Sequence, residues 1–258
     1  MLIARLPRTE FLRCYFSYEP GEHVAFWEPT QQGKTHLMYQ MLDIAMLQNP
    51  QLSVASLMPK SVDPATRHWA VDLGLKITDQ WPPLPRFPGT TKPRGHVLWP
   101  RHLPTTVPVK VRREYLASKF RPCLGRQLEK GNSITAVDDA YQMCVVLGLN
   151  MDLEEILTIG GGAGAAAWVA SQKASGTRQG GITSFALNSP THLLLGHDPY
   201  AANQKRLADI SGVDMRLVRA VVPNLRKHRI RTPNGYKNIS EKLYIRKDGP
   251  YMAIIEPF

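Results

Sequence analysis

The sequence predicts an α/β fold in which a mostly parallel β-sheet carries helices on both faces. Three observations support this fold class. Strand-like apolar segments alternate with helix-like segments, as in residues 52–57 and 65–73, and this alternation is typical of parallel sheets. Between residues 24 and 47 a strand passes through a glycine-containing loop into a helix. Two apolar runs around Asp248-Gly249 predict a small C-terminal β-hairpin.

The periodicity of apolar residues places the elements in order along a single domain, residues 1–258. We expect strands within a lead-in segment, 1–22, and then at 23–27, 52–57, 97–99, 133–137, 165–171, 191–195, 243–246 and 251–255. We expect helices at 36–47, 65–73, 109–130, 140–147, 152–159, 200–210 and 214–222. Residues 223–258 should form an appendage that contains the hairpin.

Local signals support several of these boundaries. Asp63 followed by Pro64 is the expected entry to a helix, and Gly74 is a typical residue just past a helix end. Pro122 should kink or split the helix 109–130 because proline lacks the N–H group that a helix needs. The five prolines within 81–95 predict a loop without sheet pairing.

The loop Glu28-Pro-Thr-Gln-Gln-Gly-Lys-Thr35 fits the end of the pattern G-x-x-x-x-G-K-[ST]. Gly33 lets the backbone approach a phosphate, Lys34 reaches the β/γ oxygens, and the Thr35 hydroxyl faces Mg²⁺. The helix N-terminus behind the loop favours an anion. Glu28 stands where the pattern begins with glycine, and a chance Gly-Lys-Thr is the alternative. The predicted nucleotide-binding residues are Thr30, Gln31, Gln32, Gly33, Lys34, Thr35 and His36, with ATP and Mg²⁺ as ligands.

Two acids, Asp138 and Asp139, follow the strand 133–137. Asp138, with Thr35, is the expected Mg²⁺ ligand, and Asp139 is the expected catalytic carboxylate that orients the attacking water. The alternative is that the pair merely caps the next helix. Gln172, after the strand 165–171, is either a sensor of the γ-phosphate or the end of a surface loop.

The chain carries 32 Lys and Arg against 21 Asp and Glu, a formal net charge of +11. This excess predicts a polyanionic partner, nucleic acid first, and a merely solvated basic surface is the alternative. The three cysteines, far apart, support neither a disulfide framework nor a zinc site. No apolar run approaches the roughly 18–20 residues of a transmembrane helix, so we expect a soluble cytoplasmic protein.

Over residues 20–222 the chain resembles the FtsK/HerA superfamily of DNA-translocating ATPases, closest to small forms in bacteriophages and actinobacteria. The resemblance rests on Pro20-Gly-Glu-His23, the Gly-Lys-Thr loop, Asp138-Asp139 and the Ala170-Ser-Gln-Lys-Ala-Ser175 run. It implies a RecA-like P-loop core, a homo-oligomeric ring, commonly a hexamer, and ATP-driven movement or packaging of double-stranded DNA. Lys34 and Thr35 would be the Walker A pair, Asp138 the Walker B acid, Asp139 the catalytic carboxylate and Gln172 the sensor. A phage-encoded form would lie in the host cytoplasm.

Four positions depart from that superfamily: Glu28 replaces glycine, Asp139 replaces glutamate, and Gly161 and Lys173 each stand where arginine is usual. A shortened carboxylate or a missing arginine finger slows phosphoryl transfer strongly. Lys173, Arg178 and Arg206 are the candidate replacement cations. Two alternatives therefore stay open: a DNA-binding or assembly subunit that does not turn over ATP, and a small-molecule phosphotransferase with a substrate lid and no ring.

Overall fold

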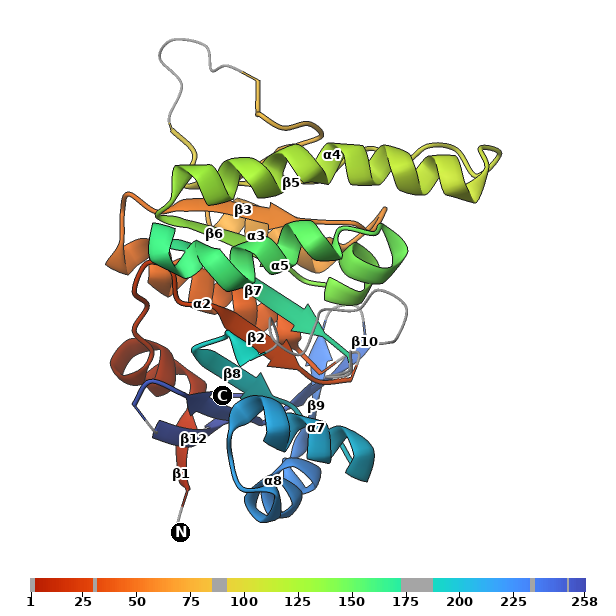
Figure 1. Ribbon diagram of the computed structural model, residues 1–258. Coiled ribbons are helices and arrows are strands. Elements are labelled where there is room, and N and C mark those ends of the chain that lie inside the picture. The colour runs from red at the N-terminus through yellow and green to blue at the C-terminus, as the bar shows by residue number, and fades with distance from the viewer. Residues whose placement is uncertain (1–2, 30–31, 85–91, 173–187, 233–234, 250) are drawn as a thin grey trace.

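The computed structural model describes residues 3–29, 32–84, 92–172, 188–232, 235–249 and 251–258, and everything below concerns these residues. Among them, strands form one ten-stranded sheet and one separate two-stranded ribbon (Figure 1). Within the described ranges no helix is both long and apolar enough to cross a bilayer.

The large sheet runs in the order β1-β12-β11-β8-β2-β7-β6-β3-β5-β4. Neighbours pair in parallel from β8 through β4 and also between β1 and β12, whereas β11 is antiparallel to both β8 and β12. The separate ribbon consists of β9 and β10. The strand bounds are β1 Ala4–Pro7, β2 Val24–Trp27, β3 Ser53–Leu57, β4 Leu75–Thr78, β5 Gly95–Leu98, β6 Ser133–Val137, β7 Ala165–Ser171, β8 His192–Leu195, β9 Lys227–Thr232, β10 Gly235–Ser240, β11 Lys242–Arg246 and β12 Tyr251–Glu256.

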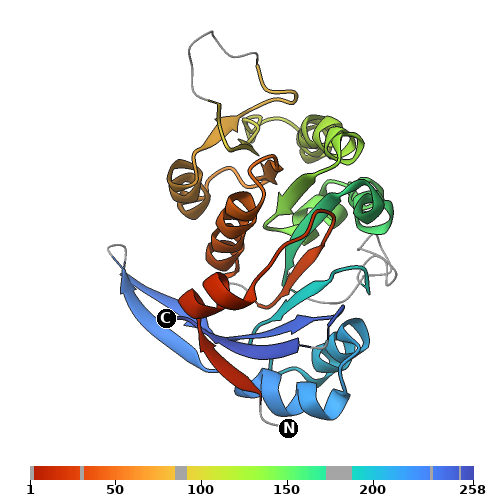
Figure 2. The same cartoon turned by 90° about the vertical axis from the view of Figure 1, so that its left-hand side faces the viewer.

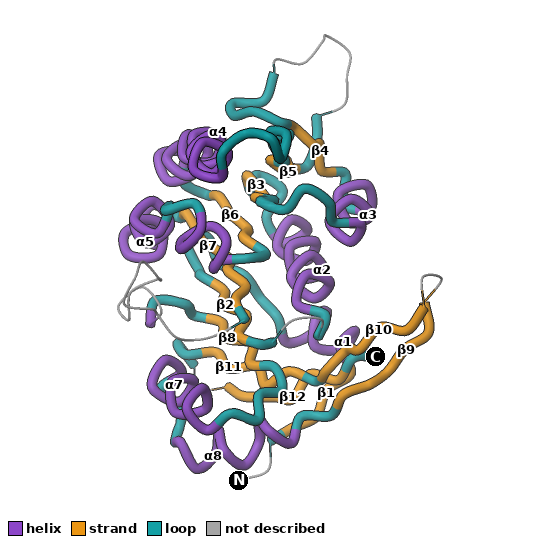
Figure 3. The backbone as a smooth tube through the Cα atoms, turned by 90° about the vertical axis from the view of Figure 1, so that its right-hand side faces the viewer, coloured by secondary structure: helices purple, strands orange, loops and turns teal. Residues whose placement is uncertain are grey.

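Helices cover both faces of this sheet, as Figure 3 shows. On one side lie α1 (Arg8–Glu10), η1 (Phe11–Tyr15), α2 (Lys34–Gln48) and α3 (Pro64–Asp72). On the other lie α4 (Val109–Lys130), α5 (Asn150–Ile159), α7 (Ala201–Ser211) and α8 (Met215–Val221). The short segment η2 (Gln142–Val146) lies between β6 and α5, η3 (Gly160–Ala163) between α5 and β7, and η4 (Val222–Asn224) between α8 and β9.

Alternating side chains of each strand build a core on each face. In β2, Val24 and Phe26 join the cluster under α2, whereas Ala25 and Trp27 join the cluster under α4 and α5. All four are at most 3 % exposed. A strand that is buried on both faces has a continuous run of apolar residues in the sequence. This run is why β2 could be predicted from the sequence.

Several sequence expectations are confirmed, because their signals are local. The parallel α/β class and the C-terminal hairpin β11–β12 are as predicted. Asp63 caps α3 by accepting a hydrogen bond from the Ala65 N–H at 3.0 Å. Gly74 adopts a positive φ of 64° just past that helix.

Other expectations are wrong. The split considered for Pro122 does not occur, because α4 continues as one helix from Val109 to Lys130 with Pro122 inside it; a kink at this position stays a prediction. Residues 140–147 contain the π-helical turn η2 rather than an α-helix. The edge strand β4 was not predicted, and β11 and β12 belong to the main sheet rather than to an appendage because β8 offers them an open edge. The part of 223–258 that stands apart is the ribbon β9–β10, visible at the side of the molecule in Figure 2.

Candidate nucleotide-binding site

The glycine-lysine-threonine loop joins β2 to α2 at the carboxyl edge of the sheet. Gly33 caps α2 with φ +92° and ψ 17°, a left-handed conformation that glycine adopts without strain. A Cβ at this position would lie 3.4 Å from Ile239 of β10, an ordinary contact distance, so the loop lies against the base of the ribbon β9–β10. Thr30 and Gln31 lie outside the described residues, and Gln32 is buried. The N-terminal N–H groups of α2 therefore face the loop, as anion binding requires.

Lys34 turns its ammonium group into this loop. Its Nζ donates hydrogen bonds to the carbonyl oxygens of Glu28 and Pro29, each at 3.0 Å. Burial lowers the pKa of Lys34, while the charges of Glu28, Asp138 and Asp139 oppose that shift. The lysine is thus a fixed donor inside the loop, and phosphate oxygens are stronger acceptors than the carbonyls it now contacts.

Thr35 and Asp138 meet although they are distant in the sequence. The Thr35 hydroxyl donates to Asp138 Oδ1 at 2.7 Å, and Asp138 is 5 % exposed at the end of β6. Lys60, which follows β3, places its Nζ 3.0 Å from the other carboxylate oxygen. Burial works against the charge of Lys60, but the neighbouring Asp138 carboxylate outweighs it, and the pKa of Lys60 is raised.

This pair of oxygen ligands fits Mg²⁺, which prefers carboxylates and hydroxyl or water oxygens. The site already accommodates one positive group beside Asp138, the Lys60 ammonium. A bound divalent ion would therefore meet a carboxylate that is held in place, and it would compete with Lys60 for the second oxygen.

Asp139 behaves differently from its neighbour. Its Oδ1 accepts the Gln142 N–H at 3.0 Å, and its carbonyl accepts the Met143 N–H at 3.1 Å. Asp139 thus caps the helical turn that follows β6, the alternative considered for it. Its charge nevertheless acts on Lys34, so the carboxylate lies within electrostatic reach of the loop.

Gln172 and His36 occupy defined places at the edge of this site. Gln172 follows β7, which lies between β2 and β6, and is exposed. At the end of β7 the Ser171 carbonyl accepts a hydrogen bond from the Glu28 N–H at 3.1 Å. This bond holds the backbone just before Gln172 next to the loop. The ring of His36 packs edge-on against Trp69 of α3, with centroids 4.8 Å apart.

Among the proposed replacement cations, Arg206 lies half-buried on α7. Lys173 and Arg178 fall outside the described residues.

Glu28, the departure from the usual loop pattern, is buried and paired. The side chains of Glu28 and Lys242 are each 1 % exposed, and Lys242 Nζ lies 2.6 Å from Glu28 Oε2. Lys242 Nζ also donates to the Gln32 carbonyl at 2.9 Å, which links β11 to the loop. Burial lowers the pKa of Lys242, and the Glu28 carboxylate opposes the shift. A methyl group on Gly196 would overlap the Glu28 side chain, so glycine at position 196 makes room for it.

Sequence reasoning missed Lys60, Lys242 and Gly196. The position of Lys60 just after an apolar strand is a weak indication that it belongs to the site, because the residues that follow parallel strands lie at the same edge of a sheet. Lys242 and Gly196 come from distant segments, and no local pattern connects them to Glu28.

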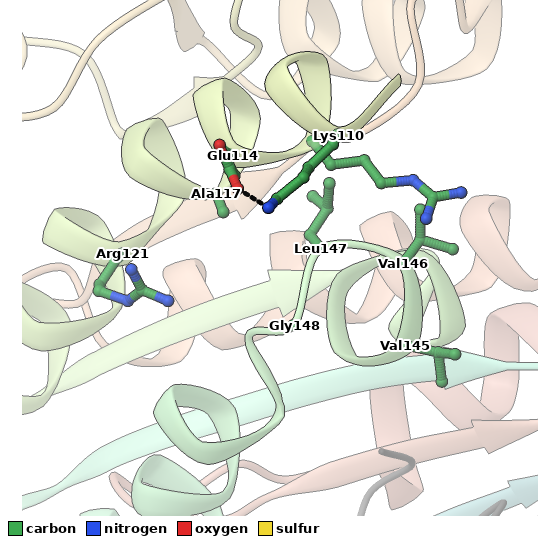
Figure 4. Close-up of a pocket in the computed structure, with 9 residues that line it drawn as sticks. Lys110, Glu114, Ala117, Arg121, Val145, Val146, Leu147 and Gly148 are labelled. Atoms are coloured by element: carbon green, nitrogen blue, oxygen red, sulfur yellow. Dashed lines mark ion pairs between the residues drawn. The ribbon is translucent and has the colours of Figure 1, made fainter. Parts of the chain in front are cut away.

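A separate cavity of about 440 Å³ lies between α4 and η2. Its lining includes Lys110 and Arg121 of α4 and the apolar Val146 and Leu147 (Figure 4). Neither Lys34 nor Asp138 lines it, so it is not the loop site.

The parallel sheet, the loop between β2 and α2, and the strand β7 between β2 and β6 define a RecA-like P-loop NTPase fold. Among solved structures, the chain is similar to the genome packaging NTPase B204 of Sulfolobus turreted icosahedral virus 2 in complex with sulfate. The TM-score is 0.56, the identity is 11 %, and the match covers 93 % of this chain and 98 % of that one.

The same NTPase in complex with ATP-gammaS matches with a TM-score of 0.52 and 9 % identity, over 93 % of this chain and 99 % of that one. The DNA-packaging ATPase B204 of Sulfolobus turreted icosahedral virus matches with a TM-score of 0.54 and 12 % identity, over 93 % and 100 %. No protein-family model matches the chain, and no curated protein does. At these identities the similarity concerns the fold.

Proposed function

We propose that the protein is an ATP-driven motor of the FtsK/HerA type that translocates or packages double-stranded DNA. The observation that carries the proposal is the Thr35–Asp138 hydrogen bond of 2.7 Å, which joins the Walker A threonine to the Walker B acid. The fold shared with a packaging NTPase and the +11 charge support the DNA part.

Each residue of the site has a role in this proposal. Lys34 leaves its two loop carbonyls and binds the β/γ-phosphate oxygens of ATP, alongside the N–H groups of residues 30–36. Asp138 and Thr35 would hold Mg²⁺, and the ion would supply positive charge next to the phosphates. Gln172 senses the γ-phosphate side from the end of β7.

Asp139 orients the attacking water after its carboxylate turns from the Gln142 N–H toward the γ-phosphate. Lys60, already beside Asp138, is a further cation that stabilises charge on the transferred group. It joins Lys173, Arg178 and Arg206 as a candidate for that role. The motor works as a homo-oligomeric ring, a hexamer, in the cytoplasm, which is the host cytoplasm if a phage encodes the chain.

A second candidate is a DNA-binding or assembly subunit that binds nucleotide without turning it over. The capping hydrogen bond of Asp139 favours it, because the carboxylate is engaged by the Gln142 N–H instead of being turned toward the phosphate loop. Both candidates predict DNA binding, so only turnover separates them.

The test is ATP turnover with and without duplex DNA, together with the mass of the particle in solution. Lys34→Ala should abolish nucleotide binding because it removes the fixed cation of the loop. Asp139→Asn should lower turnover by roughly 10²–10⁴-fold and leave ATP bound. Asparagine caps helices as well as aspartate does, so this variant keeps the fold. Asp139→Glu should raise turnover.

If wild type, Asp139→Asn and Asp139→Glu all hydrolyse ATP at the same background rate, the motor proposal is refuted and the non-hydrolysing subunit is supported. Unchanged ATP affinity in Lys34→Ala would end the nucleotide assignment altogether. A monomer that phosphorylates a nucleoside would favour the phosphotransferase.

A further inference from the structure

The ribbon β9–β10 stands apart from the main sheet, and its two faces differ. Six residue pairs run antiparallel from Lys227↔Ser240 to Thr232↔Gly235. Figure 3 shows the ribbon extending away from the body beside the C-terminus, on the side of the sheet that carries α2. Because side chains alternate along a strand, Lys227, Arg229 and Arg231 share one face and His228 and Ile230 share the other.

The inner face packs on the body of the protein. His228 pairs with Ile239, which is 6 % exposed and lies against Gly33. The His228 ring also packs edge-on against Phe258, with centroids 5.7 Å apart. Along β9, His228 and Ile230 are half-buried, so their side of the ribbon faces the protein; at the base of the ribbon Ser240, the cross-strand partner of Lys227, is buried as well.

The outer face is cationic. Lys227, Arg229, Arg231 and the cross-strand residue Asn238 are all exposed. Residues 226–240 contain no Asp or Glu, and Glu241 follows them. The three cations of this face amount to about a quarter of the formal net charge of +11. Along one strand, positions two residues apart lie roughly 6.7 Å from each other, which gives a row of three cations.

We propose that this outer face of β9–β10 binds the phosphate backbone of duplex DNA. The occupant follows from charge complementarity: a row of three exposed cations, Lys227, Arg229 and Arg231, matches a regular polyanion. A two-stranded β-ribbon also has the width that the major groove of B-DNA admits. The assignment rests on the proposed DNA motor function and names the element that holds its DNA.

The base of the ribbon connects this face to the nucleotide loop. The Ser240 N–H donates to the Gln32 carbonyl at 3.3 Å, and the Ser240 hydroxyl donates to Gln32 Oε1 at 2.9 Å. Lys242, two residues further on, donates to the same Gln32 carbonyl. A change in the loop on ATP binding therefore reaches the ribbon through one shared residue, and DNA held there responds to the nucleotide.

The experiment measures fluorescence anisotropy of a labelled DNA duplex titrated with the full chain between 50 and 200 mM salt. The test variant replaces Lys227, Arg229 and Arg231 by glutamine. The matched control replaces Lys110, Arg113 and Arg126 of α4 by glutamine, at the far end of the sheet, and changes the net charge equally. ATP affinity is measured for both variants.

The slope of log affinity against log salt should fall by up to about 2.7 in the ribbon variant, at about 0.9 per lost phosphate contact. Wild type would then lose about 40-fold more affinity across this salt range than the ribbon variant. The control should keep most of the wild-type slope, and both variants should bind ATP normally. A non-hydrolysable ATP analogue should shift the DNA affinity of the wild type.

Each contrary outcome has its own meaning. Wild type without salt-dependent DNA binding would refute the proposed function itself. Wild type that binds DNA, with the ribbon variant equal to the control, would refute only the ribbon assignment. A change in particle mass, with DNA affinity intact, would mark the face as a contact between subunits and overturn the proposal. DNA affinity unmoved by the ATP analogue would refute the coupling through Gln32.

Discussion

Replacing Lys242 by methionine should destabilise the protein strongly, because the change leaves the Glu28 carboxylate buried without its partner. Both side chains are 1 % exposed, and their charged atoms lie 2.6 Å apart. Methionine keeps the length of the stem but removes the ammonium group. Breaking one partner of a buried ion pair costs about 3–5 kcal/mol.

Urea unfolding followed by circular dichroism measures this loss. With a denaturant slope of about 3 kcal/mol per molar, at the upper end for urea, the midpoint should fall by about 1–1.7 M. The matched control is Lys110→Met, whose pair with Glu114 is 4.0 Å long and largely exposed. An exposed pair of this kind contributes about 0–1 kcal/mol, so the control should unfold near the wild-type midpoint.

The double variant Glu28→Gln with Lys242→Met shows how much of the lost stability comes from the unpaired Glu28 carboxylate and how much from the other contacts of Lys242. Removing the carboxylate as well should restore about 2 kcal/mol relative to Lys242→Met alone, a coupling typical of residues in contact. Full recovery is not expected, because Lys242 Nζ also donates to the Gln32 carbonyl. The reasoning is refuted if Lys242→Met unfolds like the Lys110→Met control, or if the double variant is no more stable than Lys242→Met.

Three further predictions concern stability. Burial lowers the pKa of His23 to about 4, below its usual 6.5, and His23 Nδ1 accepts the Ala167 N–H. The unfolded chain therefore binds the extra proton, so stability should fall by roughly 3 kcal/mol from pH 7 to pH 4. Urea midpoints of His23→Gln should lack this part of the pH dependence; an identical pH profile in both proteins contradicts the assignment. Gly196→Ala should lower the melting temperature because its methyl group overlaps Glu28, and adding it to a chain that already carries Glu28→Gly with Lys242→Met should lower the melting temperature far less; an equal loss in both backgrounds would argue against this contact. Asp139→Ala should cost about 1 kcal/mol without nucleotide through loss of a cap, and urea midpoints equal to those of Asp139→Asn would disprove the cap.

The sequence predicted the elements whose signals are local. Apolar strands buried on both faces, such as β6 and β7, appear as continuous runs. The Asp63 cap and the loop before α2 depend on a few adjacent residues. The edge strand β4 was missed because it has four residues and pairs with β5 alone.

The part of the site that depends on strand order was harder to predict. Lys60 meets Asp138 because β6 and β3 are parallel neighbours, and Thr35 meets it although β7 lies between β2 and β6. No residue near Lys60 in the sequence indicates this pairing. Asp139 illustrates a different difficulty: a carboxylate after a strand serves equally well as a helix cap or as a catalytic group. Only the direction of its hydrogen bond, toward Gln142, distinguishes the two in this state.

The contacts around Glu28 also restrict how this chain can change during evolution. A lysine at position 242 without the glutamate would be an unpaired buried charge, and a side chain at position 196 would displace that glutamate. The three positions should therefore be inherited as a set, with glycine at position 28 accompanied by an uncharged residue at 242 and freedom at 196. Single substitutions between the two sets pass through a less stable protein, so each lineage tends to keep the set it began with.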